Sequence, residues 1–222
     1  MAKIRNSAVG FLILAAILIS VPSKAPAQAQ PPRGERIAVI GAGPAGLTYA
    51  SLVADGNAVT VFEKEPGAGG AFNYAGKAPL FQEVAANETS FRRYIADLVA
   101  AGAMKKVEFR FATDVTAAPE LLAPFDRIVI ASGAAYRFGV GPLVRWLLDS
   151  GLARAPGVAQ LFSWGPLRDW FYYRARRGTA ERFTPLARPG QVVTVIGDAA
   201  RAGKSKQAIA GAFEAALLGK SS

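Results

Sequence analysis

Residues 36–46 read RIAVIGAGPAG, a short apolar run that leads into three glycines spaced as G-x-G-x-x-G. The apolar run predicts a buried strand, and the apolar spacing from Pro44 to Asp55 predicts a helix directly after it. In such a turn Gly41 lets the chain leave the strand sharply, Gly43 lets the backbone approach a diphosphate, and Gly46 lets the helix pack closely on the sheet. The stretch therefore predicts the first strand, turn and helix of a dinucleotide-binding fold.

The residues around this turn also suit a nucleotide. Pro44 and Ala45 begin the helix, where free N–H groups and the helix dipole favour a diphosphate. A second apolar strand, Ala58–Phe62, follows that helix and ends at Glu63. A carboxylate there accepts hydrogen bonds from both hydroxyls of a ribose, which argues against a cofactor with a 2′-phosphate. The alternative is a Rossmann-like half that has kept these residues but binds nothing.

The rest of the chain continues the alternation of strands and helices. Helices are expected over about residues 88–101 and 205–218, and short apolar strands over residues 107–111, 127–130 and 191–196. Strands that alternate with helices in this way pair in parallel. The sequence therefore predicts an α/β fold, a Rossmann-like parallel sheet with helices on both faces.

Residues 1–29 are expected to be a signal peptide or a membrane anchor. Lys3 and Arg5 precede the apolar run Ala8–Val21, and small-residue A-x-A sites end at Ala27 and Ala29. A run of this length is short for a bilayer span, which favours export to a periplasmic or secretory compartment; an uncleaved anchor is the alternative. Residues 30–222 then have room for one Rossmann-like domain.

Composition excludes several kinds of chemistry. The chain contains no His and no Cys, which excludes an imidazole base, a thiol nucleophile, a disulfide and a Cys/His zinc site, and no metal is expected.

The net charge is +10, and residues 136–188 contain nine Arg, no Lys and three acidic residues. This Arg/Trp-rich insertion, with helices expected over residues 142–152 and 166–177, is expected to meet a membrane surface or an acidic protein partner. The alternative is that it only covers the ligand pocket. Nucleic acid is not expected as a partner, because an exported chain would rarely meet it.

Three segments resemble a known class of flavoprotein. VIGAGPAGL from Val39, VTVFEK from Val59 and GAGGAFNYA from Gly67 resemble the FAD-binding start of pyridine-nucleotide-disulfide-oxidoreductase-like flavoproteins. The segments are similar in particular to the FAD- or ADP-binding region of the 2,4-dienoyl-CoA reductase and trimethylamine dehydrogenase group. Ala131-Ser132-Gly133 stands where that group has A-T-G.

The resemblance spans about residues 36–133 and 192–218, and it implies a non-covalently bound FAD that carries the redox chemistry. It implies that Glu63 binds the ribose, that Val115 contacts adenine through its backbone, and that Asp198 bonds the ribityl or phosphate part. Catalytic residues stay unassigned. The turn and the resemblance together predict the following cofactor-binding residues: Gly41, Gly43, Pro44, Ala45, Gly46, Glu63, Lys64, Gly70, Ala71, Val115, Ala131, Gly133, Gly197 and Asp198.

The same group has a second dinucleotide domain, for NAD(P)H, that has no counterpart here. The segment from Gly133 to Gly197 is too short for such a domain, and it contains no second G-x-G-x-x-G. Electrons are therefore expected from another partner or directly from a substrate. Asn73 and Tyr74 are placed near the flavin by the resemblance.

The stretch VVTVIGDAARAGKSKQAI, residues 192–209, also suggests a phosphate loop. A Walker loop has four residues between its first glycine and Gly-Lys-Ser, whereas five residues separate Gly197 from Gly203 here. No acidic Walker-B strand accompanies it, since the strand at 127–130 ends in Ala131. The stretch is therefore interpreted as the last strand and helix of the dinucleotide-binding sheet.

The sequence predicts an FAD-binding flavoprotein that acts in oxidoreduction or electron transfer with a small-molecule or protein redox partner. A non-catalytic module that holds ADP or FAD for a structural or docking purpose is one alternative. An NAD-binding, dehydrogenase-like protein that uses the first turn is the other.

Overall fold

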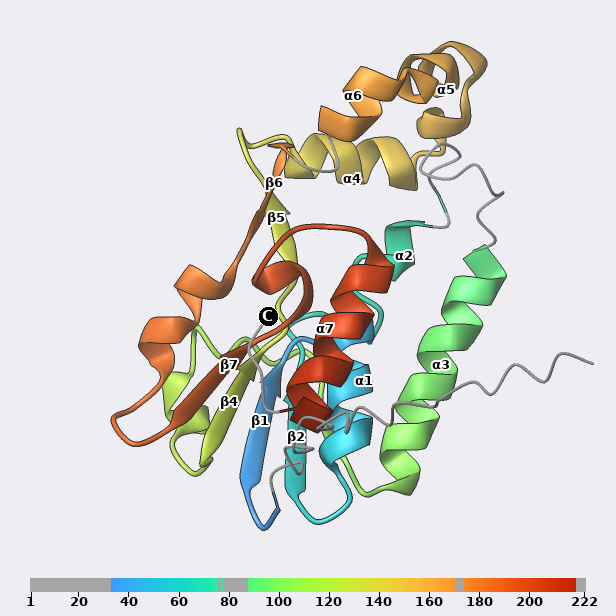
Figure 1. Cartoon of the computed structure of the whole chain (residues 1–222). Helices are drawn as coiled ribbons and strands as arrows, with labels where there is room; N and C mark the ends of the chain where they lie inside the picture. Colours follow the sequence, from blue (N-terminus) through green and yellow to red (C-terminus); the bar gives the residue numbers. More distant parts are fainter. Residues whose placement is uncertain (1–32, 76, 78–87, 171–173, 219–222) are drawn as a thin grey trace, which may run out of the picture.

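The computed structural model describes residues 33–75, 77, 88–170 and 174–218. Its centre is a parallel sheet of five strands in the order β3-β2-β1-β4-β7 (Figure 1). The strands are β1 (Arg36–Ile40), β2 (Ala58–Phe62), β3 (Glu108–Arg110), β4 (Arg127–Ile130) and β7 (Val192–Val195). The chain goes from β1 outward through β2 to β3, and then returns to the other side of β1 for β4 and β7. The point between β1 and β4 is a topological switch, where ligands bind beyond the carboxyl ends of the strands.

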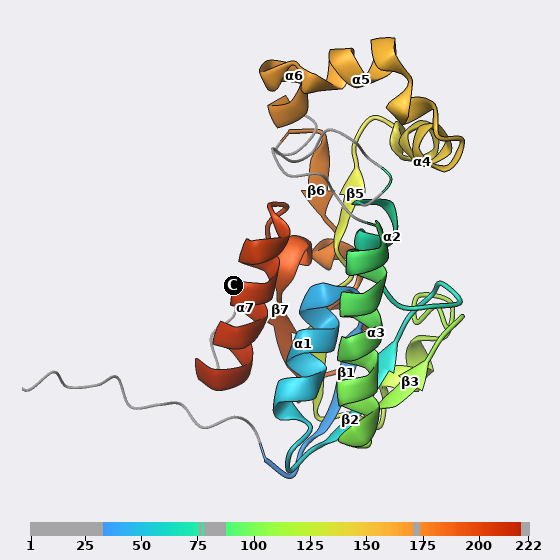
Figure 2. The same cartoon turned by 90° about the vertical axis from the view of Figure 1, so that its right-hand side faces the viewer.

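The two faces of the sheet are covered differently. The α-helices α1 (Pro44–Val53), α3 (Glu88–Met104) and α7 (Ser205–Leu218) lie side by side on one face, as both views show (Figures 1 and 2). Alternate strand residues such as Ile37 and Val39 are fully buried beneath them. The opposite face, which carries Ile40, Phe62 and Ile128, packs against the 3₁₀ turns η1 (Pro119–Leu122), η4 (Ala180–Arg182) and η5 (Thr184–Leu186).

The α/β parallel-sheet prediction is confirmed, and several boundaries agree closely. Strands β1, β2 and β4 and helix α7 have the predicted limits, while α3 extends three residues further than expected, to Met104. On the second face, the covering helices in the described part of the chain are short 3₁₀ turns.

Between β4 and β7 the chain forms a unit that we call the cap, residues 134–170 and 174–178. Strands β5 (Ala134–Tyr136) and β6 (Arg176–Gly178) pair antiparallel and rise from the sheet. At their far end lie the helices of the cap, above the carboxyl ends of the central strands (Figures 1 and 2). These helices are α4 (Gly141–Asp149), η2 (Leu152–Arg154), α5 (Pro156–Ser163) and α6 (Gly165–Asp169).

The prediction of one helix over residues 166–177 is confirmed at its start and wrong at its end. Helix α6 ends at Asp169, and Arg176–Gly178 is extended because it pairs with Ala134–Tyr136. Partners that are distant in sequence thus override the local helical pattern. The predicted signal peptide or anchor lies outside the described residues, and the division into domains stays a prediction. Within the described ranges no helix has the length and hydropathy that a bilayer span requires.

Candidate functional site

The three glycines of the first turn have different surroundings. Gly41 has a φ of +109°, and a Cβ atom there would lie 2.6 Å from the carbonyl oxygen of Ala131. A Cβ atom on Gly46 would lie 2.1 Å from the carbonyl oxygen of Gly41, so only glycine lets α1 approach the turn this closely. A Cβ atom on Gly43 would meet nothing within 4 Å. The turn therefore leaves open space at Gly43, beside the amino end of α1, where free N–H groups favour an anion.

Glu63 is held at the carboxyl end of β2 and is 8% exposed. The N–H of Ala42, inside the glycine turn, donates to its Oε2 at 2.8 Å, and the N–H of Glu65 donates to its Oε1 at 3.0 Å. These bonds fix the carboxylate against the turn. A carboxylate oxygen can accept more than one hydrogen bond, so both oxygens keep the capacity to accept a ribose hydroxyl.

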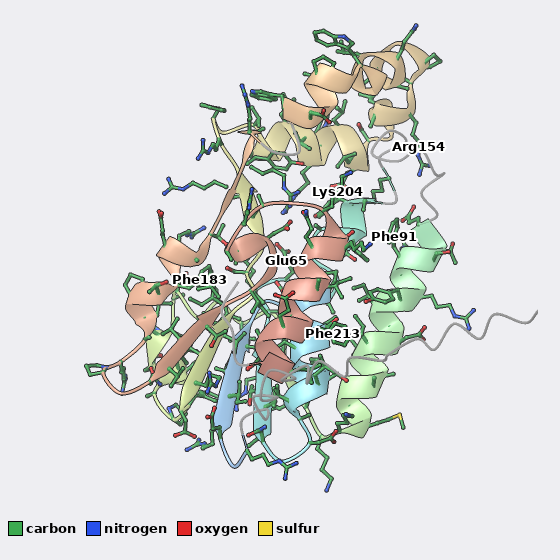
Figure 3. All side chains as sticks on the ribbon, viewed as in Figure 1. Glu65, Phe91, Arg154, Phe183, Lys204 and Phe213 are labelled. Carbon is green, nitrogen blue, oxygen red and sulfur yellow. The ribbon has the colours of Figure 1, made fainter. Side chains whose placement is uncertain are left out.

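A cavity of about 1090 Å³ lies above the carboxyl ends of the strands. It extends from Glu63 and Val115 at one end to Asp198 and Ser205, the first residue of α7, at the other. Figure 3 shows Glu65, Phe91 and Lys204 in the zone between the sheet and the cap. Every predicted cofactor-binding residue lines the cavity except two, Gly46 and Gly197.

Those two glycines act through packing instead. Gly46 packs beneath Gly41. Gly197 has a φ of +62°, and a Cβ atom there would lie 2.8 Å from the Cβ of Ala45, so this glycine lets the turn after β7 approach α1. Both glycines therefore shape the cavity wall from behind.

A short helix, α2 (Phe72–Ala75), forms one side of the cavity. Asn73 Nδ2 donates to the carbonyl oxygen of Ala68 at 3.2 Å, which ties the helix to the glycine loop before it. The ring of Tyr74 lies under two cations, with Arg145 at 5.3 Å and Lys77 at 5.6 Å from its centroid. Since Arg145 belongs to α4, this contact attaches the cap to the side of the cavity.

The opposite end of the cavity contains an ion pair that sequence reasoning missed. Arg176 of the cap pairs with Asp198, and both side chains are largely buried, at 14% and 17% exposure. The N–H of Gly203 donates to Asp198 Oδ1 at 3.2 Å, and Arg176 Nη1 donates to the Gly203 carbonyl at 3.4 Å. The resemblance implied that Asp198 bonds a cofactor; in the structure this carboxylate also holds the cap to the loop before α7. The only sequence signal for Arg176 was the excess of arginine in the insertion.

Two further side chains lining the cavity have altered acidity. Burial raises the pKa of the Tyr136 phenol, partly offset by the positive charge of Arg176, so this hydroxyl stays protonated at neutral pH. Near Glu63, hydrogen bonds from the Thr116 hydroxyl and N–H lower the pKa of Asp114, and Lys64 adds a smaller effect of the same sign. The cavity thus has a neutral phenol and the Arg176–Asp198 ion pair at one end, and the carboxylates of Glu63 and Asp114 at the other. The described residues contain no group of three acidic side chains that could hold a metal ion.

Comparisons with known proteins agree with this geometry. A family model described as an NAD(P)-binding Rossmann-like domain matches residues 39–79. The chain is 34% identical over 111 residues to the glutamate synthase (NADPH) small chain of Mycobacterium tuberculosis, a match covering 48% of this chain and 22% of that protein. It is 34% identical over 141 residues to the NADP(+)-dependent formate dehydrogenase subunit beta of Moorella thermoacetica, covering 56% of this chain and 19% of that protein. The matches thus span about a fifth of the length of these curated relatives.

Solved structures share the fold over more of the chain. A 2-naphthoyl-CoA reductase superposes with a TM-score of 0.64 at 16% identity, covering 87% of this chain and 41% of that one. Histamine dehydrogenase from Rhizobium sp. 4-9 superposes with a TM-score of 0.61 at 17% identity, covering 84% and 44%. At these identities the likeness shows the fold alone. Together the comparisons confirm a Rossmann-like fold, in which residues 39–79 are similar to NAD(P)-binding domains and longer segments are similar to parts of two pyridine-nucleotide oxidoreductases.

Proposed function

We propose that this chain binds FAD non-covalently and acts in oxidoreduction or electron transfer. The observation that carries the proposal is the length of the cavity, which continues from Glu63 past the glycine turn to Asp198 and the start of α7. Its volume of about 1090 Å³ lies at the upper end of the sizes of small-molecule and cofactor pockets, roughly 300–1,000 Å³. A nucleoside diphosphate would occupy the end beside Glu63, which leaves the other end for a second group.

The residues at the glycine turn fit the phosphate part of such a cofactor. Gly43 leaves open space at the amino end of α1, and the carboxylate of Glu63 is fixed beside the turn. The diphosphate would lie in the space at Gly43 and the ribose against Glu63, with Val115 at the adenine end and Gly133 and Asp198 towards the flavin. When bound, a flavin supplies hydride and single-electron transfer, which no side chain of this chain could perform alone.

The residues of the cap would then control the redox end of the cavity. Tyr136 keeps its proton at neutral pH, and the ion pair between Arg176 and Asp198 fixes the cap beside the loop before α7. Helix α4 is held over the side of the cavity formed by α2 through the contact of Arg145 with Tyr74 and the ion pair between Lys77 and Asp149, at 2.6 Å.

A pyridine nucleotide in the same turn is the second candidate. The family model at residues 39–79 is described as NAD(P)-binding, and the names of both curated relatives include NADPH or NADP(+). The carboxylate of Glu63 favours a cofactor with a free ribose 2′-hydroxyl. Among pyridine nucleotides this residue therefore supports NAD rather than NADP. A structural module that holds ADP or FAD without turnover is the remaining alternative.

The identity of the released cofactor separates these candidates. The protein is produced with ample riboflavin in the medium, its visible spectrum is recorded, and the ligand released by heat is identified by chromatography. FAD that candidate donors reduce supports the proposal, and FAD that no donor reduces supports the structural module. Released NAD, or a colourless protein that binds only ADP, overturns it.

The redox partner and the location of the protein are inferred from the sequence. With no second dinucleotide-binding motif between Gly133 and Gly197, we propose that electrons pass to or from a small molecule or a protein partner. The charged and apolar pattern of residues 1–29 supports export or membrane anchoring. Sequencing the amino terminus of the mature protein from cells distinguishes cleavage from anchoring.

A further inference from the structure

The cap has few buried apolar side chains and several exposed ones. Among the cap residues whose burial the structure describes, Ala153 and Ala175 are the only buried hydrophobic residues. Six of the eleven exposed large hydrophobic side chains in the described part of the chain belong to it: Phe138, Leu143, Trp146, Leu152, Leu161 and Trp164. A concentration of exposed large apolar side chains in one unit is typical of an interaction surface.

In helix α4 the exposed apolar side chains lie on one side of the helix, away from the cavity. Val144 and Leu148, four residues apart, line the cavity and so face the sheet. Leu143 and Trp146, three residues apart, share the outer side and are 61% and 57% exposed. The inner side of α4 therefore lines the cavity, and its outer side presents apolar residues to solvent.

The end of the β5–β6 ribbon adds an aromatic pair with cations beside it. Phe138 stacks on Trp170 with ring centroids 6.3 Å apart, and remains 76% exposed. Its φ of +59° is costly for a bulky residue, and burial of the ring does not offset that cost. Arg137 precedes this pair and Arg174 follows it, and both are exposed. Aromatic rings and guanidinium groups are therefore displayed together.

We propose that the cap docks on an anionic lipid surface. The cap contains seven Arg, no Lys and two Asp, a net charge of +5. Apart from Arg176, which pairs with Asp198, these arginines complement anionic headgroups. Trp and Phe beside Arg is the composition that enters the boundary between headgroups and acyl chains, whereas an acidic protein partner would not require so many exposed large apolar residues. The proposal is independent of the cofactor, because the outer side of the cap does not line the cavity.

The tryptophans of the chain make the test specific to the cap. All three, Trp146, Trp164 and Trp170, lie in it, so their emission reports the cap even if residues 1–29 also bind lipid. Full-length protein is mixed with vesicles of phosphatidylcholine, with or without phosphatidylglycerol. With the anionic lipid, emission is expected to shift to shorter wavelength and to be quenched by brominated acyl chains. Vesicles of phosphatidylcholine alone are expected to bind at least about tenfold more weakly.

Two variants with matched controls separate charge from apolar contact. Removing two cations with Arg137→Gln/Arg174→Gln is expected to weaken binding to anionic vesicles by about thirtyfold. Its control, Arg33→Gln/Lys106→Gln, removes the same charge at the opposite end of the molecule and is expected to change binding by less than about threefold, because those residues stay away from the lipid.

For the apolar part, Leu143→Ser is expected to weaken binding by about tenfold. Its control, Met104→Ser, alters a side chain that is 86% exposed at the carboxyl end of α3 and is expected to have no effect. Thermal melts establish that all variants are folded. An unshifted tryptophan emission with anionic vesicles, or equal effects of variants and controls, overturns the proposal. Retention on immobilised polyglutamate without any lipid response also overturns it, in favour of an acidic protein partner.

Discussion

Two glycines of the first turn, three residues apart, should respond to the same substitution in opposite ways. An alanine Cβ at position 46 would lie 2.1 Å from the carbonyl oxygen of Gly41, whereas ordinary contact begins at 3.4 Å. Relief of this overlap requires α1 to move by about 1 Å in a closely packed interior, which typically costs 1–3 kcal/mol and occasionally more. Gly46→Ala should therefore lower the melting temperature by about 6–12 °C for a loss of roughly 3 kcal/mol in a domain of this size.

Gly43→Ala should leave the fold intact and lower the affinity for the cofactor. Gly43 has φ −81° and ψ 177°, a conformation that alanine adopts freely, and its Cβ would meet nothing in the protein. Stability should stay unchanged or rise by about 0.4–1 kcal/mol, because alanine restricts the unfolded chain. The methyl group would occupy the space proposed for the diphosphate. Loss of one charged hydrogen bond, about 1.5–3 kcal/mol, lowers affinity at least about tenfold.

Thermal melts without ligand and a fluorescence titration with FAD measure both quantities for each variant. FAD affinity equal to wild type in Gly43→Ala would show that the diphosphate does not lie beside this residue. A wild-type melting temperature for Gly46→Ala would refute the close approach of α1 to the turn.

Three further predictions concern buried polar groups. Glu63→Gln places an amide NH₂ opposite an N–H donor, either that of Ala42 or that of Glu65. The free energy of unfolding, measured in urea, should fall by about 1–3 kcal/mol, and the affinity for FAD or ADP should also fall. Burial raises the pKa of Tyr49 to about 12, so its contribution to stability is complete below pH 10 and is lost between pH 10 and about 12. The wild-type free energy of unfolding should therefore fall by roughly 2–3 kcal/mol more than that of Tyr49→Phe between pH 10 and about 12. An equal dependence of the free energy of unfolding on pH in both proteins would contradict this. A double-mutant cycle with Asp198→Asn and Arg176→Gln should give a coupling energy of about 1–3 kcal/mol by thermal unfolding, and additive effects would mean that the pair does not hold the cap.

The sheet and its first turn could be predicted because their signals are local. Strands β1 and β2 are continuous apolar runs closed by glycine or an acidic residue, and the spacing of Gly41, Gly43 and Gly46 defines a strand–turn–helix without information from elsewhere. The steric surroundings of these glycines agree with the separate functions assigned to them. Helix α7 was also placed correctly, since a small-residue loop and a long helical pattern follow β7 directly.

The cap could not be predicted because its structure depends on distant contacts. Strands β5 and β6 have three residues each, too few for a periodic signal, and form only when residue 134 meets residue 178. The helical spacing that predicted a helix through Arg177 is locally sound, but the ribbon satisfies the backbone hydrogen bonds of Arg176–Gly178 instead. The pair between Arg176 and Asp198 follows from that rearrangement. The arginine excess indicated that the segment was unusual, but not which arginine would turn inward.

The cap takes part both in the proposed cofactor site and in the proposed docking surface. On its inner side Tyr136, and Arg176 in its ion pair with Asp198, line the end of the cavity where we propose that the flavin binds. Its outer side presents Leu143 and Trp146 to solvent. Because one short helix, α4, carries both sides, a partner that binds outside cannot displace that helix without disturbing the contact between Arg145 and Tyr74 at the side of the cavity. Whatever the cap binds is therefore in a position to affect access to the redox end of the site.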